Sequence, residues 1–168
     1  MLVPLFAIEG PWRGRLAIAP APAPGKQLEK NLRHWKKLGL SVVLSLMVPG
    51  ERPGWENEEE LCRSLGLKFY SLPVPDHSVP APEDLSTVEA RLVALEADLR
   101  GGEKIAVHCF AGIGRSGIAT IALLVIAGVP LDEATNLVSD ARGLPTPETP
   151  EQLEWLRAFD RHRRLSYT

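Results

Sequence analysis

The sequence predicts one α/β domain with a central, mostly parallel sheet of four or five strands and helices on both sides. Short apolar runs alternate with segments whose apolar residues recur at helical spacing. Residues 41–48 are almost continuously apolar, which is typical of a strand buried on both faces of a parallel sheet. A chain of 168 residues is also long enough to bury one proper core. We therefore expect residues 1–168 to form a single domain.

The expected elements follow one another along the whole chain. Strands are expected at residues 12–18, 41–48, 67–72 and 105–107. Helices are expected at residues 26–38, 56–65, 85 to about 99, about 115 to 127, 131–142 and 151 to about 164. Proline-rich stretches predict loops at residues 19–25, 73–82 and 143–150. The acidic side chains of residues 56–65 are expected to form a solvated helix face.

Composition and charge exclude several classes of protein. A net charge of -2 argues against general affinity for nucleic acid or membrane surfaces. No apolar run approaches the roughly 18 residues of a membrane span, and the first ten residues do not resemble a signal peptide. Two cysteines, Cys62 and Cys109, do not make a disulfide framework. We expect a cytoplasmic monomer that binds neither nucleic acid nor membrane.

The segment from Lys104 to Ile118 carries the strongest chemical signal. A short apolar strand ends at Cys109, and a glycine-containing turn leads directly into an apolar helix that begins near Arg115. The turn directs backbone N–H groups inward, and the helix N-terminus adds unpaired donors and its positive dipole end. Such a nest suits phosphate. It also favours the thiolate form of Cys109 near neutral pH, which makes this side chain a nucleophile.

The Cys-x5-Arg-Ser pattern of Cys109, Arg115 and Ser116, preceded by His108, resembles the signature of the cysteine-dependent protein tyrosine phosphatase superfamily, in its compact dual-specificity form. The resemblance implies that Cys109 attacks phosphorus and forms a phosphocysteine. It implies that Arg115 binds two phosphate oxygens and that Ser116 donates to the sulfur when the intermediate breaks down. The remaining substrate-binding positions are then Phe110, Ala111, Gly112, Ile113 and Gly114.

Asp76 is the candidate general acid and base. It lies 33 positions before Cys109 in a proline-rich loop that follows an expected strand, and the resemblance places the acid of the family about there. The alternative is a turn residue that accepts backbone N–H groups. Glu83 and Asp84 are rival acids, although both are better explained as first-turn charges of a helix. The chain has Val74 where many tyrosine-specific members have Trp, so we expect less loop motion.

Two further residues are expected to support the site. His108 precedes the nucleophile at a strand end, and we expect it to be buried, hydrogen-bonded to the loop backbone and important for the shape of the loop. Gln152 resembles the glutamine that aims the hydrolytic water in some compact members, or it is an ordinary polar residue of a first helical turn. No metal or other cofactor is expected, because the nucleophile comes from the protein.

The expected substrates are phosphorylated proteins, with phosphotyrosine first and phosphoserine or phosphothreonine as further candidates. The chain lacks a segment that deepens the phosphotyrosine pocket in larger relatives. Phosphoinositide phosphatases of the family tend to have Lys where this chain has Phe110 and Ile113, which disfavours a multiply phosphorylated headgroup. The alternatives are a phosphoinositide or other small phosphate-monoester phosphatase, a phosphate-binding module without turnover, and a rhodanese-like sulfur transferase, whose loop is typically one residue shorter.

Overall fold

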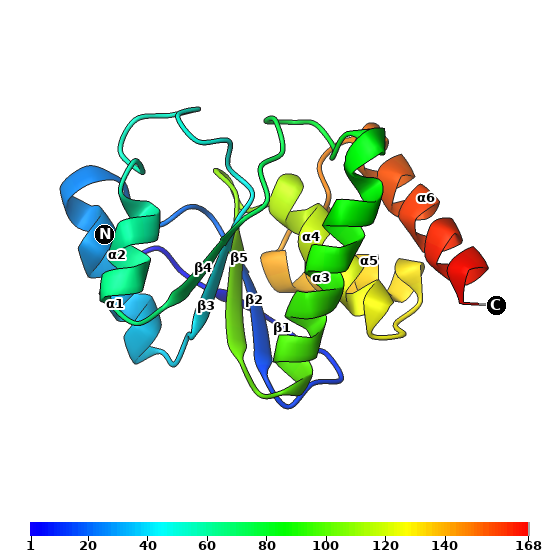
Figure 1. Ribbon diagram of the computed structural model, residues 1–168, viewed down its shortest axis with the longest axis horizontal. Coiled ribbons are helices and arrows are strands. Elements are labelled where there is room, and N and C mark those ends of the chain that lie inside the picture. Colours follow the sequence, from blue (N-terminus) through cyan, green and yellow to red (C-terminus); the bar gives the residue numbers. More distant parts are fainter. Residues whose placement is uncertain (168) are drawn as a thin grey trace.

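A five-stranded sheet with the order β1-β2-β5-β3-β4 runs through the middle of the computed structural model, which describes residues 1–167 (Figure 1). The strands are β1 (Phe6–Ile8), β2 (Arg15–Ala19), β3 (Val42–Ser45), β4 (Lys68–Ser71) and β5 (Lys104–His108). Only β1 is antiparallel to its neighbour; β2, β5, β3 and β4 are mutually parallel. The α/β class and the mostly parallel sheet expected from the sequence are confirmed.

Helices cover both faces of this sheet. On one side lie α1 (Leu28–Lys37) and α2 (Glu58–Ser64), and on the other lie α3 (Leu85–Arg100), α4 (Arg115–Ile126), α5 (Leu131–Arg142) and α6 (Pro150–Ser166) (Figure 1). Single 3-10 turns at Gly25–Gln27 and Pro82–Asp84 lead into α1 and α3. Within residues 1–167, no helix has the length and apolar character needed to cross a membrane.

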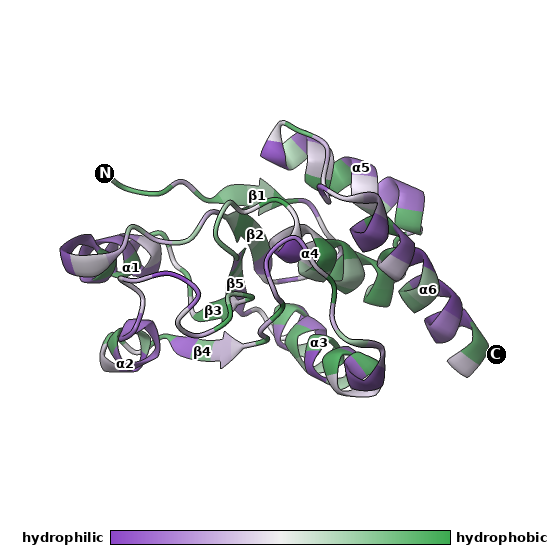
Figure 2. Cartoon of the chain, turned by 90° about the horizontal axis from the view of Figure 1, so that it is seen from above, coloured by the Kyte–Doolittle hydropathy of each residue, from purple (hydrophilic) through white to green (hydrophobic). Residues whose placement is uncertain are grey.

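Alternate residues of the central strands enter two separate apolar cores. Val42 and Leu44 of β3 pack with α3, α4, α5 and α6, whereas Val43 between them packs with α1 and α2. Strand β3 is therefore buried on both faces, as its apolar run predicts. After Arg115 and Ser116, helix α4 is almost entirely apolar and lies between the sheet and helices α5 and α6 (Figure 2).

Strand β1 was not expected from the sequence. It has three residues and little local signal, and it exists because it pairs with β2, with Phe6 opposite Ile18 and Ile8 opposite Leu16. The strand expected at residues 12–18 is β2, displaced by a few residues. The strand expected at 41–48 ends at Ser45, whose hydroxyl accepts a hydrogen bond from the Met47 N–H at 3.3 Å as the chain turns away.

The loops that follow β3, β4 and β5 leave the sheet at the same edge, because these strands are parallel. They lie together above the sheet in Figure 1, and the loop before α6 joins them there. The loop after β5 also contacts the end of β2, where the Ala21 N–H donates to the Phe110 carbonyl at 3.0 Å. This edge gathers residues that are far apart in the sequence.

Gly112 is required where the loop after β5 passes β2. Its φ is +72°, a conformation that side chains disfavour, and a Cβ there would overlap the backbone of Ala19 and Pro20. Gly102 also has a positive φ of +104°, but a Cβ at that position would meet nothing. Substitution of Gly102 tests the energetic cost of a side chain at positive φ alone, whereas substitution of Gly112 adds the cost of overlap with the backbone.

We predict that Gly112→Ala lowers the free energy of unfolding by about 1 to 3 kcal/mol more than Gly102→Ala does, because only the former forces backbone atoms apart. Urea unfolding at a common m-value measures the difference. Equal losses for the two variants would contradict the close approach of this loop to β2.

Candidate active site

The loop between β5 and α4, residues 109–114, forms a cradle of backbone N–H groups. Among the described residues, none accepts a hydrogen bond from the N–H groups of residues 111–116. Three of these donors lie at or beside the N-terminus of α4, whose first turn has unpaired donors and the positive end of the helix dipole. The loop can therefore bind an anion such as phosphate.

Arg142 on α5 orients the outer side of this cradle. Its Nε donates to the Gly112 carbonyl at 2.9 Å and its Nη2 to the Ala111 carbonyl at 3.1 Å. Since a peptide's carbonyl and N–H groups point in opposite directions, carbonyls turned outward leave neighbouring N–H groups turned inward. The sequence analysis did not identify Arg142, because an Arg at the end of a helix has no distinguishing local pattern.

Cys109 lies at the floor of the cradle with 3% of its surface exposed. Its Sγ lies 3.2 Å from the Oγ of Ser116, in the first turn of α4. The hydroxyl is thus within reach to donate to a sulfur anion. The two residues are seven positions apart in the sequence, and the turn between them brings the start of α4 back to the end of β5.

Arg115 is buried beside the cradle, with 2% of its surface exposed. Its Nη1 and Nη2 donate to the two carboxylate oxygens of Glu51 at 2.6 and 3.0 Å, and Nη1 also donates to the Val74 carbonyl at 3.0 Å. Burial would lower the pKa of Arg115, but Glu51, Cys109 and Asp76 together raise it, so the guanidinium stays charged.

Glu51 was missed by the sequence analysis, which assigns no role to it. Its carboxylate also accepts the Val48 N–H at 2.6 Å and so stabilises the loop after β3. The sequence did contain one indication of a role for Glu51: an acidic residue that follows a central parallel strand lies at the same sheet edge as the cradle. Nothing in the local sequence indicates that the side chain turns toward Arg115.

Asp76 lies at the same place, on the loop after β4. Its Oδ1 is 3.2 Å from Nη2 of Arg115 and accepts the N–H of His77 at 3.0 Å. The carboxylate is exposed rather than buried. The structure thus brings together the candidate nucleophile's loop, the candidate phosphate ligand and the candidate acid, whereas it puts Glu83 in the 3-10 turn that leads into α3.

Side-chain contacts join the loop that carries Asp76 to the loop before α6. His77, whose φ of 60° is unusual for a residue with a side chain, lies with Nδ1 2.5 Å from Oε1 of Glu148. Nε2 of Gln152 donates to the Ser78 carbonyl at 3.1 Å. These two contacts hold the Asp76 loop over the cradle. Neither Glu148 nor His77 was assigned a role in this connection from the sequence, because the loops are about 70 residues apart.

Gln152 is fully buried and adjacent to the cradle, since a Cβ on Gly114 would lie 2.9 Å from its amide atoms. Its Oε1 accepts the N–H groups of Glu148 and Thr149, each at 3.2 Å, and its backbone N–H donates to the Thr149 hydroxyl. Together with Thr149 it forms a capping box at the start of α6. The side chain therefore has a structural task beside any catalytic one.

One side of the cradle mouth is aromatic. Phe110 is 36% exposed, the guanidinium of Arg52 stacks over its ring at 3.5 Å, and the ring of Trp55 meets it edge-on at 6.0 Å. A flat substrate group bound in the cradle would lie beside this wall. Among residues 1–167, no three His, Cys, Asp or Glu side chains are grouped so as to hold a metal ion.

His108 is fully buried, and its Nδ1 lies 3.1 Å from the Cys109 carbonyl, so the backbone contact expected from the sequence is present. Its other ring nitrogen meets Glu58 of α2 at 2.6 Å. The expectation that the acidic residues of this helix form a solvated face is wrong for Glu58, which is 4% exposed. Its helix turns this first-turn side chain toward the sheet, as it does Cys62 four residues later.

Comparisons with known proteins agree with this geometry. Residues 19–129, which are 111 of the 168 residues, match the family model described as a DSP-PTPase phosphatase of polymorphic toxin systems. Cyclin-dependent kinase inhibitor 3 of Mus musculus is 25% identical over 137 residues, covering 80% of this chain and 64% of that protein. The chain thus spans slightly less than two-thirds of the length of this relative.

Solved structures show the same fold. Kinase associated phosphatase (KAP), with its catalytic site cysteine substituted by serine, aligns with a TM-score of 0.85 at 17% identity, over 100% of this chain and 98% of that one. Tk-PTP in its active form aligns with a TM-score of 0.75 at 29% identity, over 93% and 97% of the two chains. With most of its length matched by the family model, the chain belongs to the DSP-PTPase family of cysteine-based dual-specificity phosphatases.

Proposed function

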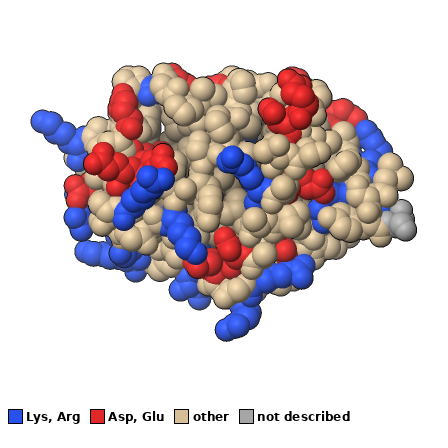
Figure 3. Space-filling view, in the orientation of Figure 1, with Lys and Arg blue, Asp and Glu red and all other residues tan. Residues whose placement is uncertain are grey.

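We propose that this protein dephosphorylates phosphotyrosine in proteins, with phosphoserine and phosphothreonine as further substrates, through a phosphocysteine on Cys109. The observation that carries the proposal is the convergence of Cys109, Arg115 and Asp76 around a cradle of unpaired N–H groups. Membership of a phosphatase family supports the same reaction class. Lys, Arg, Asp and Glu are interspersed on the face drawn in Figure 3, so attraction for a phosphate arises locally at the cradle rather than from a broad basic surface.

In the first step, the Cys109 thiolate attacks phosphorus while the bond to the substrate oxygen breaks. The cradle N–H groups and Arg115 stabilise the charge on the phosphoryl oxygens, and Asp76 donates its proton to the leaving oxygen. Arg115 is already held in place by Glu51 and the Val74 carbonyl, so little side-chain freedom is lost when phosphate binds. A phosphate oxygen would replace Asp76 as a partner of Nη2, freeing the carboxyl for proton transfer.

In the second step, water attacks the phosphocysteine and Asp76, now ionised, accepts its proton. The Ser116 hydroxyl, 3.2 Å from Sγ, donates to the departing thiolate. Gln152 lies beside the cradle and is proposed to position the water. Its Nε2 donates one N–H to the Ser78 carbonyl, and its second N–H is the donor proposed for the water molecule.

A phosphate-binding module without turnover would use the same cradle but would not need both a thiol and an acid beside it. A phosphoinositide phosphatase remains the alternative enzyme, and the aromatic wall of Phe110 and Trp55 favours a phenyl group over a polyhydroxylated ring. Hydrolysis of matched phosphotyrosyl, phosphoseryl and phosphoinositide substrates decides between them. We expect the highest kcat/KM for release of inorganic phosphate from the phosphotyrosyl peptide. A higher kcat/KM for the phosphoinositide would overturn the proposed substrate class.

Cys109→Ser is predicted to reduce hydrolysis of phosphotyrosyl peptides by at least about a thousandfold, because the serine hydroxyl is not ionised at neutral pH. Cys62→Ala serves as the control, since Cys62 lies in the core beside α1 and α2 and should leave turnover within about twofold once folding is verified. Full activity of the serine variant would exclude the covalent mechanism.

Asp76→Ala is predicted to lower kcat by about 10² to 10⁴ for a phosphotyrosyl peptide, but much less for an aryl phosphate whose phenol is very acidic and leaves without a proton. Asp84→Ala, which removes a carboxylate beside the start of α3, should change neither rate. Equal losses on the two substrates would remove Asp76 from the acid role.

Gln152→Ala is predicted to slow phosphocysteine hydrolysis by about ten- to a hundredfold, so that an aryl phosphate gives a burst of phenol equal to the enzyme concentration. Thr149→Ala disrupts the same capping box and should lower stability by about 0.5 to 2 kcal/mol without producing a burst. If both variants behave alike in rapid mixing, Gln152 acts only as a helix cap.

A further inference from the structure

His108 and Glu58 form a buried pair that the reaction as described above does not use. Nε2 of His108 lies 2.6 Å from Oε1 of Glu58, and the two side chains are 0% and 5% exposed. His108 ends β5, directly before the nucleophile, and Glu58 belongs to the first turn of α2. Burying two titratable groups at this distance costs free energy unless their charges are opposite and their hydrogen-bonding groups are satisfied.

The hydrogen-bond partners define the protonation of the ring. Nδ1 of His108 faces the Cys109 carbonyl at 3.1 Å, and a carbonyl oxygen only accepts, so Nδ1 carries a proton. Nε2 faces a carboxylate, which also only accepts when ionised. When Glu58 is a carboxylate, both ring nitrogens are donors and the ring is an imidazolium. It therefore puts a positive charge one residue from the Cys109 sulfur.

The charged groups around His108 act in opposite directions. Burial lowers the pKa of His108, and so does the Arg115 guanidinium of α4. Glu58 of α2, by its charge and its hydrogen bond, and the Cys109 carbonyl raise the pKa, and the balance is a pKa above the ordinary histidine value. Among these groups, the carboxylate of Glu58 makes the largest contribution that raises the pKa of His108 and so favours the imidazolium.

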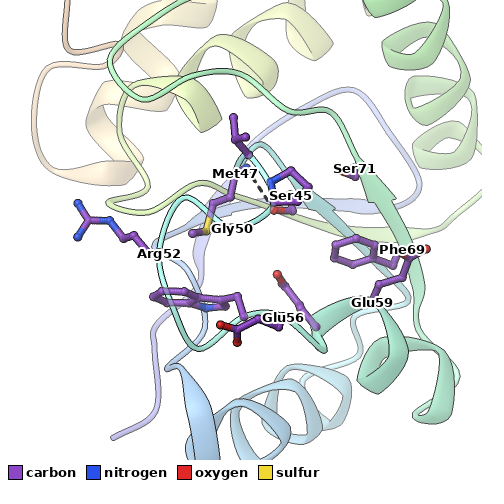
Figure 4. A pocket seen from close by; sticks show the side chains of 12 residues that line it. Ser45, Met47, Gly50, Arg52, Glu56, Glu59, Phe69 and Ser71 are labelled. Carbon is purple, nitrogen blue, oxygen red and sulfur yellow. Dashed lines mark hydrogen bonds between the residues drawn. The ribbon is translucent and has the colours of Figure 1, made fainter.

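Glu58 differs from the acidic residues beside it. Glu58 is 4% exposed, although Glu59 lines the same pocket of about 150 Å³ as it does. Figure 4 shows Glu59 at this pocket with Ser45 and Phe69. Glu59 follows Glu58 on α2 but is exposed, and it pairs with Arg63 one turn later at 2.6 Å. Glu59 is therefore a matched control: the same residue type, on the same helix turn, without a contact to His108.

We propose that Glu58 is a positioning residue for the nucleophile and acts on Cys109 through His108. The carboxylate holds the imidazolium, the Nδ1–H of the imidazolium holds the Cys109 carbonyl, and the positive charge favours the thiolate. The proposal rests on the proposed function only in taking Cys109 as the reactive sulfur. A pair with a purely structural role would stabilise the fold without changing how the reactivity of Cys109 depends on pH.

The test is the rate at which iodoacetamide alkylates Cys109 between pH 4 and 9, measured by peptide mass in the wild type, Glu58→Gln and Glu59→Gln. Gln keeps the size of Glu58 and an acceptor for Nε2, so only the charge is lost. We expect the midpoint of the Glu58→Gln profile to rise by about one pH unit, a usual effect of a nearby charge. Below the midpoint this is a tenfold slower reaction, and Glu59→Gln should match the wild type.

Cys62 does not interfere, because burial, with smaller contributions from Glu58 and Glu59, raises the pKa of its thiol to about 12. Alkylation reports the thiolate whether or not the protein hydrolyses phosphate, so a failure of the proposed function would appear as absent turnover with an intact alkylation profile. A folded Glu58→Gln variant with the wild-type midpoint would overturn the proposal.

A second measurement keeps the proposal testable if Glu58→Gln does not fold. The ¹⁵N chemical shifts of the wild-type His108 ring at pH 7.5 distinguish an imidazolium from either neutral tautomer. Two protonated nitrogens are expected, and a neutral ring at this pH would overturn the proposal.

Discussion

A buried positive charge constrains the arrangement of the whole site. The guanidinium of Arg115 is 2% exposed, and a charge at that depth needs compensating partners. Glu51 and the Val74 carbonyl supply them, and Asp76 approaches from the outside. Because the first two of these groups belong to loops after β3 and β4, compensating Arg115 also folds both loops over the start of α4.

The cradle depends on a second constraint, the direction of its peptide groups. Arg142 accepts no hydrogen bond and can only donate, so it holds the carbonyls of Ala111 and Gly112 on the outer side. Gly112 permits the positive φ and the contact with β2. The N–H groups are left on the inner side beside the helix terminus. Preorganised donors of this kind stabilise an anion without reorganising when charge develops.

Two contacts hold the Asp76 loop, which has Val74 where many tyrosine-specific members of the family have Trp. His77 contacts Glu148, and Gln152 contacts the carbonyl of Ser78, so the loops before α3 and α6 are joined above the cradle. Joining two loops reduces the number of conformations that the exposed Asp76 can adopt. The carboxylate is therefore positioned by its neighbours, although its own side chain is not buried.

The sequence by itself determined the class of fold, the order of nearly all the elements and the loop from Cys109 to Ser116. These are local features: apolar spacing reports a strand or helix directly, and the candidate nucleophile Cys109, its hydroxyl partner Ser116 and Arg115 are within eight consecutive residues. Only the tertiary structure decided the contacts of Glu51, Glu58, Arg142 and Glu148, together with the existence of β1. From the sequence alone, a charged residue on a turn or at a helix end is expected to be exposed to solvent. The direction of its side chain depends on the parallel strands that end at one sheet edge and on the helices packed beside them.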